Sequence, residues 1–190
     1  MSVNLSAANL SDPKLIDQIN EILNETGIQP ASLKLEITES AVMKNADTAI
    51  ESMKSIKETG VSLSIDDFGT GYSSLSYLQK FPIDYLKIDR SFVSAMENGD
   101  ENEEIVRTII ALSKALKLSV VAEGIETKLQ FEKLKELGCE FGQGYFFARP
   151  LPASAVEAFL KEDGAWPDLI TADMFSSFGP DEPIHLDTTH

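Results

Sequence analysis

Six short apolar runs, rich in β-branched residues, recur along the chain, and amphipathic helical stretches separate most of them. The runs cover residues 2–5, 33–38, 61–67, 85–89, 118–123 and 142–147. Strands that alternate with helices are typical of a parallel sheet covered by those helices. The pattern therefore predicts an α/β fold in which these six runs are parallel strands.

The helical stretches between the runs have recognisable ends. Asp12 and Pro13 predict the start of the first helix, because aspartate caps helices and proline suits the first helical position; Gly27 ends it. Further helices are predicted over residues 46–58, 74–79, 101–117, 127–137 and 155–161. Each of them repeats apolar residues at helical spacing, as expected for a helix that packs one face on a sheet.

A polar or ionisable side chain lies in or just after each predicted strand. In parallel α/β folds the chemistry takes place at the carboxyl ends of the strands, which share one edge of the sheet. We therefore expect these side chains to converge on one face and to form an active site. They are Asn4, Glu36, Asp66, Asp67, Lys87, Asp89, Glu123 and Gln143.

The pair Asp66-Asp67 is the strongest of these signals. Adjacent carboxylates at the end of an apolar strand repel each other unless a cation lies between them, so the pair favours a metal site over a surface charge. Glu36 and Glu123, each considered alone, are equally compatible with a helix cap or a surface charge. Lys87 lies within an apolar strand and requires an anionic partner, and Asp89 on the same strand face could supply it.

Composition narrows the chemistry further. The net charge of -15 argues against a nucleic acid polymer or an anionic lipid surface as partner. Cys139 is the only cysteine, and both histidines, His185 and His190, lie at the C-terminal end. Thiolate, zinc and imidazole chemistry are therefore not expected in the body of the chain. The candidates that remain are carboxylates, amides, Lys87, water and a hard cation such as Mg²⁺, Mn²⁺ or Ca²⁺.

The chain divides by composition near residue 162. Residues 1–162 hold all the predicted strands and helices, whereas residues 163–190 contain six acidic residues, three prolines and no Lys or Arg. We interpret 163–190 as an acidic, solvated tail, with docking through Trp166 to Phe178 as the alternative. No apolar run approaches the ~20 residues of a membrane span, and no signal peptide is recognised, which favours a cytoplasmic protein.

Six motifs, in order along the chain, resemble those of the EAL domain family. They are Asn4-Leu5-Ser6, Glu36-Ile37-Thr38-Glu39, the run from Asp66 to Leu75, the run from Lys87 to Phe92, the run from Ala122 to Glu126, and Gln143-Gly144-Tyr145. Members of that family are bacterial phosphodiesterases that hydrolyse cyclic di-GMP to linear pGpG. The resemblance extends from the start of the chain to about Pro152. It implies a TIM-like (β/α) barrel with two divalent ions at the strand ends.

The resemblance also implies roles for individual residues. Asn4, Glu36, Asp66 and Asp67 would bind two Mg²⁺ or Mn²⁺ ions, with Asp66 bridging them and Ca²⁺ acting as an inhibitor. Lys87 and Glu123 would position or activate the attacking water, and Asp89 and Gln143 would support the metal and water network. Glu39 and Glu126 would brace the loop 68–74, which couples dimerisation to activity in the family. The implied partners are cyclic di-GMP, a second copy in a homodimer, and fused or paired GGDEF or sensor domains.

The sequence departs from the family in one respect. Family members have two further strands before the Asn-Leu-Ser strand, and the second of these carries a Glu-Ala-Leu triplet that occurs nowhere here. The expected barrel is therefore incomplete, with about six of eight strands, and its edges near Val3 and Tyr145 are expected to associate. Two interpretations stay open: a cyclic di-GMP phosphodiesterase, or a truncated or degenerate module that binds ligand or a partner without catalysis.

Overall fold

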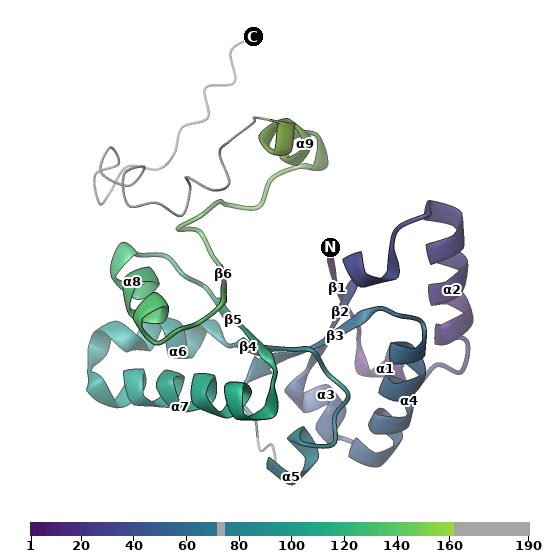
Figure 1. Ribbon diagram of the computed structural model, residues 1–190, viewed down its shortest axis with the longest axis horizontal. Helices are drawn as coiled ribbons and strands as arrows, with labels where there is room; N and C mark the ends of the chain where they lie inside the picture. Colours follow the sequence, from purple (N-terminus) through teal and green to yellow (C-terminus); the bar gives the residue numbers. More distant parts are fainter. Residues whose placement is uncertain (72–74, 162–190) are drawn as a thin grey trace. The chain divides into compact units, whose positions relative to one another are not determined.

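The computed structural model describes residues 1–71 and 75–161. Within these ranges, six strands form one parallel sheet in which the order of the strands follows the chain (Figure 1). The prediction of an α/β fold, an incomplete TIM-like (β/α) barrel with six parallel strands, is confirmed. The strands are β1 (Ser2–Asn4), β2 (Lys34–Thr38), β3 (Ser62–Phe68), β4 (Tyr85–Ile88), β5 (Ser119–Glu123) and β6 (Phe141–Gln143).

Helices fill every connection between these strands. The described helices are α1 (Ala7–Leu10), α2 (Leu15–Thr26), α3 (Glu39–Met43), α4 (Ala46–Glu58), α5 (Leu75–Leu78), α6 (Arg90–Ala95), α7 (Asp100–Leu116), α8 (Lys128–Glu136) and α9 (Ala153–Lys161), with 3-10 turns η1 (Pro30–Ser32) and η2 (Met96–Asn98). None of the described helices is long and apolar enough to cross a membrane.

The chain divides into two units: residues 1–146 contain the described sheet, and the second unit begins at residue 147 and contains α9. The predicted acidic tail, and the alternative in which Trp166 to Phe178 dock, lie outside the described residues and stay predictions.

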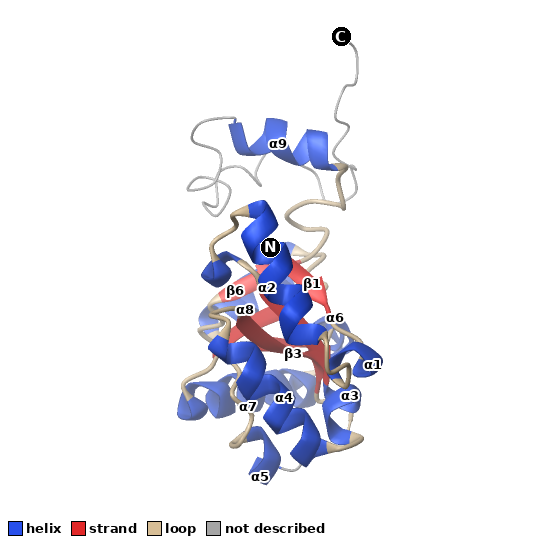
Figure 2. Ribbon diagram, turned by 90° about the vertical axis from the view of Figure 1, so that its right-hand side faces the viewer, coloured by secondary structure: helices blue, strands red, loops and turns tan. Residues whose placement is uncertain are grey.

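One face of the sheet is apolar and covered by helices. The side chains of Leu35, Ile37, Leu63, Leu86 and Ile88 are at most 5% exposed. Helices α3 and α4 contact β2 or β3, and α6 and α7 contact β4 or β5. Figures 1 and 2 show these helices on one side of the strands. Burial of this apolar surface, at about 25 cal/mol per Å², stabilises the arrangement that positions the strand ends.

The opposite face, which we call the inner face, is mostly polar. Side chains alternate along a strand and residues in register share a face, so the inner face can be read from the strand pairing. Barrel interiors are normally filled by branched apolar side chains. The polar inner face therefore indicates a surface that performs chemistry. It includes Asn4, Lys34, Glu36, Ser64, Asp66, Tyr85, Lys87, Glu123 and Gln143.

Three predicted boundaries are wrong by two residues or more, and one of them is the start of α9, which lies at Ala153 instead of residue 155. Helix α2 begins at Leu15 instead of Pro13, and the Asp12 carboxylate accepts a hydrogen bond from the Lys14 N–H at 2.9 Å. The sixth strand ends at Gln143 instead of extending to residue 147. The Ile125 N–H donates to the Gln143 carbonyl at 3.1 Å, and the Phe146 N–H donates to the Ile125 carbonyl at 2.9 Å. The chain therefore turns away after β6, and Tyr145 is not on the sheet edge.

An ion pair at the amino ends of β3 and β4 provides a test of the fold. The Lys57 ammonium lies 2.8 and 2.7 Å from the two carboxylate oxygens of Asp84, and the Leu63 N–H donates to the same carboxylate at 2.8 Å. Asp84→Ala leaves both donors without this acceptor, so we expect the free energy of unfolding to fall by about 2 kcal/mol.

The matched control is Glu51→Ala, which removes a pair with Lys54 that is 73% and 57% exposed. Exposed pairs contribute little, so this change should cost less than about 1 kcal/mol. Urea unfolding followed by circular dichroism measures both. Equal losses in the two variants would contradict the account.

Candidate active site

A buried lysine lies at the centre of an acidic cluster on the inner face. The Lys87 ammonium is 2.7 Å from Glu36 Oε2, 3.1 Å from Asp66 Oδ1 and 2.5 Å from Glu123 Oε1. These carboxylates come from β2, β3 and β5, while Lys87 comes from β4, so one side chain connects four neighbouring strands. Lys87 is 4% exposed. An ammonium has three donors; here it hydrogen-bonds to Glu36 and Glu123, and Asp66 completes the group of carboxylates around it as an ion pair.

Lys87 was predicted to require an anionic partner, and that prediction is confirmed. The prediction that Asp89 is this partner is wrong. The Asp89 carboxylate accepts a hydrogen bond from the Ser91 N–H at 2.9 Å and caps α6. Its charge still acts on the acidic cluster, because it contributes to raising the pKa of the Asp67 carboxyl, after burial and the Asp66 charge. Burial alone would raise the pKa of Asp89, but the hydrogen bonds from Ser91 outweigh burial and lower that pKa.

The charge state of Lys87 follows from its partners. Burial by itself would lower the pKa of the Lys87 ammonium. The hydrogen bonds to Glu123 and Glu36, together with the charges of Glu123 and Asp66, outweigh burial and raise that pKa well above its ordinary value. Lys87 is therefore a permanent positive charge at neutral pH.

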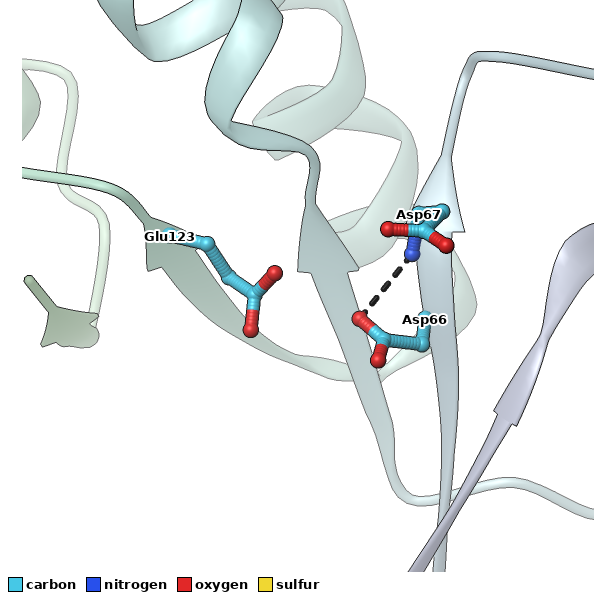
Figure 3. A group of neighbouring side chains, drawn as sticks. All are labelled: Asp66, Asp67 and Glu123. Carbon is cyan, nitrogen blue, oxygen red and sulfur yellow. Dashed lines mark hydrogen bonds between the residues drawn. The ribbon is translucent and has the colours of Figure 1, made fainter. Parts of the chain in front are cut away.

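The backbone explains how two adjacent aspartates face the same site. Successive side chains of a regular strand point to opposite faces. Asp67, however, has φ 54, in the left-handed region that aspartate tolerates, and the pairing of β3 with β4 shifts in register between Ile65 and Phe68. The Asp67 N–H donates to Asp66 Oδ1 at 3.0 Å (Figure 3). Both carboxylates consequently remain near the strand end.

Three carboxylates come together there in a way that suits a cation. One oxygen each of Asp66, Asp67 and Glu123 lies within 4.8 Å of the others, and Figure 3 shows Glu123 reaching toward the aspartates from β5. Burial, the Asp66 charge and the Asp89 charge raise the pKa of Asp67. Burial also raises the pKa of Glu123, although Lys87 partly offsets it. The three groups offer an all-oxygen donor set, which fits Mg²⁺ or Mn²⁺.

The remaining predicted site residues on the sheet lie on the neighbouring strands. Asn4 pairs in register with Glu36, and Gln143 pairs in register with Glu123, so each lies beside a member of the acidic cluster. Both are exposed on the edge strands of the described sheet. Their roles as metal ligand and as support of the water network stay predictions.

Glu39 contacts the loop that it was predicted to brace. Its side chain is 1% exposed, and its Oε2 accepts a hydrogen bond from the Gly69 N–H at 2.8 Å. A Cβ at Gly71 would lie 2.6 Å from Glu39 Oε1, so the loop passes very close to this carboxylate. Glu126 is exposed, and its N–H donates to Gln130 Oε1 at 2.8 Å. Residues 72–74 lie outside the described residues, so bracing by Glu126 stays a prediction.

Sequence reasoning missed three inner-face residues on the strands that carry the cluster: Lys34, Ser64 and Tyr85. The Lys34 ammonium lies 3.4 Å from the centroid of the Tyr85 ring. The Ser64 hydroxyl is fully buried, and within the described part of the chain it has no hydrogen-bond partner. Burial lowers the pKa of Lys34, and the negative charges of Glu36 and Asp84 offset part of that decrease. The signal was available, because each of these residues precedes a site residue by two positions on the same strand.

Comparison with known proteins agrees with this geometry. The family model for the EAL domain matches residues 1–150. NbdA of Pseudomonas aeruginosa, a cyclic di-GMP phosphodiesterase, is 48% identical over 161 residues, which are 85% of this chain and 21% of that protein. MucR of the same organism, a bifunctional diguanylate cyclase and cyclic di-GMP phosphodiesterase, is 42% identical over 158 residues, 83% of this chain and 23% of that protein.

The solved structure of the PaMucR phosphodiesterase in complex with c-di-GMP superimposes with a TM-score of 0.79 and 42% identity, covering 82% of this chain and 63% of that one. The chain thus spans about a fifth of the length of the curated relatives it matches. The family match, the relatives and the superposition coincide on the sheet that holds the acidic cluster. This chain belongs to the EAL domain family.

Proposed function

We propose that this chain provides the catalytic face of a phosphodiesterase that hydrolyses cyclic di-GMP to linear pGpG. The observation that supports the proposal best is the trio of carboxylates from Asp66, Asp67 and Glu123, whose oxygens lie within 4.8 Å of one another on the inner face. Relatives that share this domain include cyclic di-GMP phosphodiesterases. A phosphodiester carries negative charge, so an acidic site can bind it only with the help of cations.

Two divalent ions, Mg²⁺ or Mn²⁺, would suit this donor set; Asp66, Asp67, Glu36 and Asn4 would hold them, with Asp66 as the ligand shared by both. When bound, such a pair lowers the pKa of a water held between the ions and neutralises charge on the phosphate. Ca²⁺ prefers a larger and looser shell of oxygens, so we propose that it occupies the site and inhibits.

Lys87 and Glu123 act on the water and on its surroundings. The Lys87 ammonium holds Glu36, Asp66 and Glu123 in one arrangement, which keeps the metal-binding oxygens oriented before any ligand arrives. Glu123 orients the attacking water and accepts its proton, a role that suits a carboxylate whose pKa is raised by burial. Asp89 and Gln143 support this network from β4 and β6, and Glu39 and Glu126 hold the loop 68–74.

The second candidate is a module that binds cyclic di-GMP without hydrolysing it. One observation favours it: Lys87, 4% exposed, already forms ion pairs with Glu36 and Asp66, two of the proposed cation ligands, and with Glu123. For either function we propose a cytoplasmic setting. We also propose fused or paired GGDEF or sensor domains, because the relative MucR is named as both a diguanylate cyclase and a cyclic di-GMP phosphodiesterase.

The metal site is tested with Asp66→Asn. This change removes one negative charge from the ligand proposed to bridge the ions, so we expect the affinity for Mn²⁺ to fall at least about ten-fold, in keeping with the loss of a partner from a buried charged pair. Isothermal titration calorimetry at pH 7 measures it. Asp17→Asn, an identical change at an exposed position on α2, is the matched control. Equal Mn²⁺ affinities in both variants would contradict the assignment.

Hydrolysis is tested with Glu123→Gln and Lys87→Ala. With Mg²⁺ present, both variants should convert cyclic di-GMP to pGpG at least about 100-fold more slowly than wild type, a scale typical for loss of an acid–base group. Chromatography of the products measures the rate. Glu132→Gln, at an exposed position on α8, should be unaffected.

Unchanged turnover in either site variant removes that residue from the mechanism, provided that its circular dichroism spectrum matches wild type. Cyclic di-GMP binding by a wild type that does not turn over would favour the binding module instead.

We also propose that the chain forms a homodimer. In the described sheet, β1 and β6 are the edges, and Val3 and Phe141 on them are 42% and 52% exposed. Unpaired edges with exposed apolar side chains promote association. Light scattering at micromolar concentration should give a mass at least twice the monomer mass of 20.8 kDa. A stable monomer that unfolds cooperatively would contradict this.

A further inference from the structure

Two lysines lie on the inner face, and they are held in different ways. Lys87 forms ion pairs with three carboxylates. Lys34, at the start of β2, lies instead over the ring of Tyr85, with 3.4 Å between its ammonium and the ring centroid. The Tyr85 ring packs edge-on against Phe141 of β6, with centroids 6.1 Å apart and an interplanar angle of 62°. A cation over an aromatic face is attracted by the ring's quadrupole.

Lys34 lies close enough to the acidic cluster to pair with Glu36, yet it contacts the Tyr85 ring instead. Lys34 and Glu36 are two residues apart on β2 and share the inner face, which places them about 7 Å apart along the strand. A lysine side chain could span that distance. Within residues 1–71 and 75–161, however, the Lys34 ammonium forms no ion pair with Glu36 or with any other carboxylate. Tyr85 therefore keeps a positive charge near Glu36 without letting it occupy the Glu36 oxygens.

We propose that Lys34, held by Tyr85, is a fixed positive charge beneath the acidic cluster that limits the affinity of the site for divalent cations. This inference rests on the proposed metal site. A fixed cation repels a bound divalent ion, and at about 10 Å with the dielectric constant of water the repulsion weakens binding on the order of five-fold. Lys34 is a positioning residue in this account and touches neither metal nor substrate.

The proposal makes predictions of opposite sign for the two partners. Lys34→Gln removes the repelling charge, so Mn²⁺ should bind about five-fold more tightly. Tyr85→Leu removes the ring and frees the ammonium to reach Glu36, where it competes with the metal, so Mn²⁺ should bind more weakly than in wild type. In the double variant no ammonium remains to be released, so its affinity should match Lys34→Gln. A lysine and a tyrosine that only support the fold would not produce this pattern.

Calorimetric titration with MnCl₂ at pH 7, on the full chain, performs the test. Two controls are matched to the two changes. Lys135→Gln removes a charge from an exposed position on α8, and Tyr85→Phe removes the hydroxyl but keeps the ring face; both should bind Mn²⁺ as wild type does. Thermal unfolding of each variant without metal verifies that it is folded. Lys34→Gln decides the question by itself if Tyr85→Leu does not fold.

The outcomes separate this inference from the proposed function. No Mn²⁺ binding by the wild type would overturn the metal site and the role of Lys34 together. Binding by the wild type with Lys34→Gln equal to Lys135→Gln, or weaker than it, would overturn the role of Lys34 alone. Tighter binding in Lys34→Gln, weaker binding in Tyr85→Leu and recovery in the double variant would support it.

Discussion

The contact of one buried ammonium with three carboxylates is the interaction on which the site depends. Lys87 takes its partners Glu36, Asp66 and Glu123 from three other strands. A buried pair that loses one member leaves a charge without compensation, which is strongly destabilising. The register of four parallel strands is therefore coupled to the geometry of the carboxylates. The same contact keeps the site organised without a cation, while leaving it with more negative than positive charge.

The apolar face of the sheet stabilises the fold, and the inner face carries the polar groups of the site. The face covered by helices is built from side chains such as Ile37, Leu63 and Leu86 that have no measurable exposure. The inner face instead carries polar and charged groups at successive levels, from Lys34 to Glu36 and Tyr85 and then to Asp66. Because the apolar face already fixes the strands, polar residues on the inner face can be arranged for binding and charge balance.

Much of this could be predicted from the sequence, because alternating apolar runs and helix ends are local signals. The six strands and helix α4, which begins at Ala46 and ends at Glu58 as expected, follow from such signals. The prediction of Asp89 as the partner of Lys87 failed because of distance. Adjacent strands are about 4.8 Å apart, whereas residues i and i+2 on one strand are about 7 Å apart. Carboxylates on neighbouring strands are therefore nearer to the Lys87 ammonium and pair with it in place of Asp89. The left-handed conformation of Asp67 likewise has no local sequence signal, since many aspartates are compatible with it but few adopt it.

The central claim is that the acidic cluster is a binding site for two divalent cations. Anomalous X-ray diffraction from crystals of the chain grown with MnCl₂ tests it most directly, because the signal locates manganese without reference to activity. The account predicts two peaks about 3.5–4 Å apart, next to the carboxylates of Asp66, Asp67 and Glu123. A single peak elsewhere on the acidic surface, or no peak at these carboxylates at saturating manganese, would contradict it.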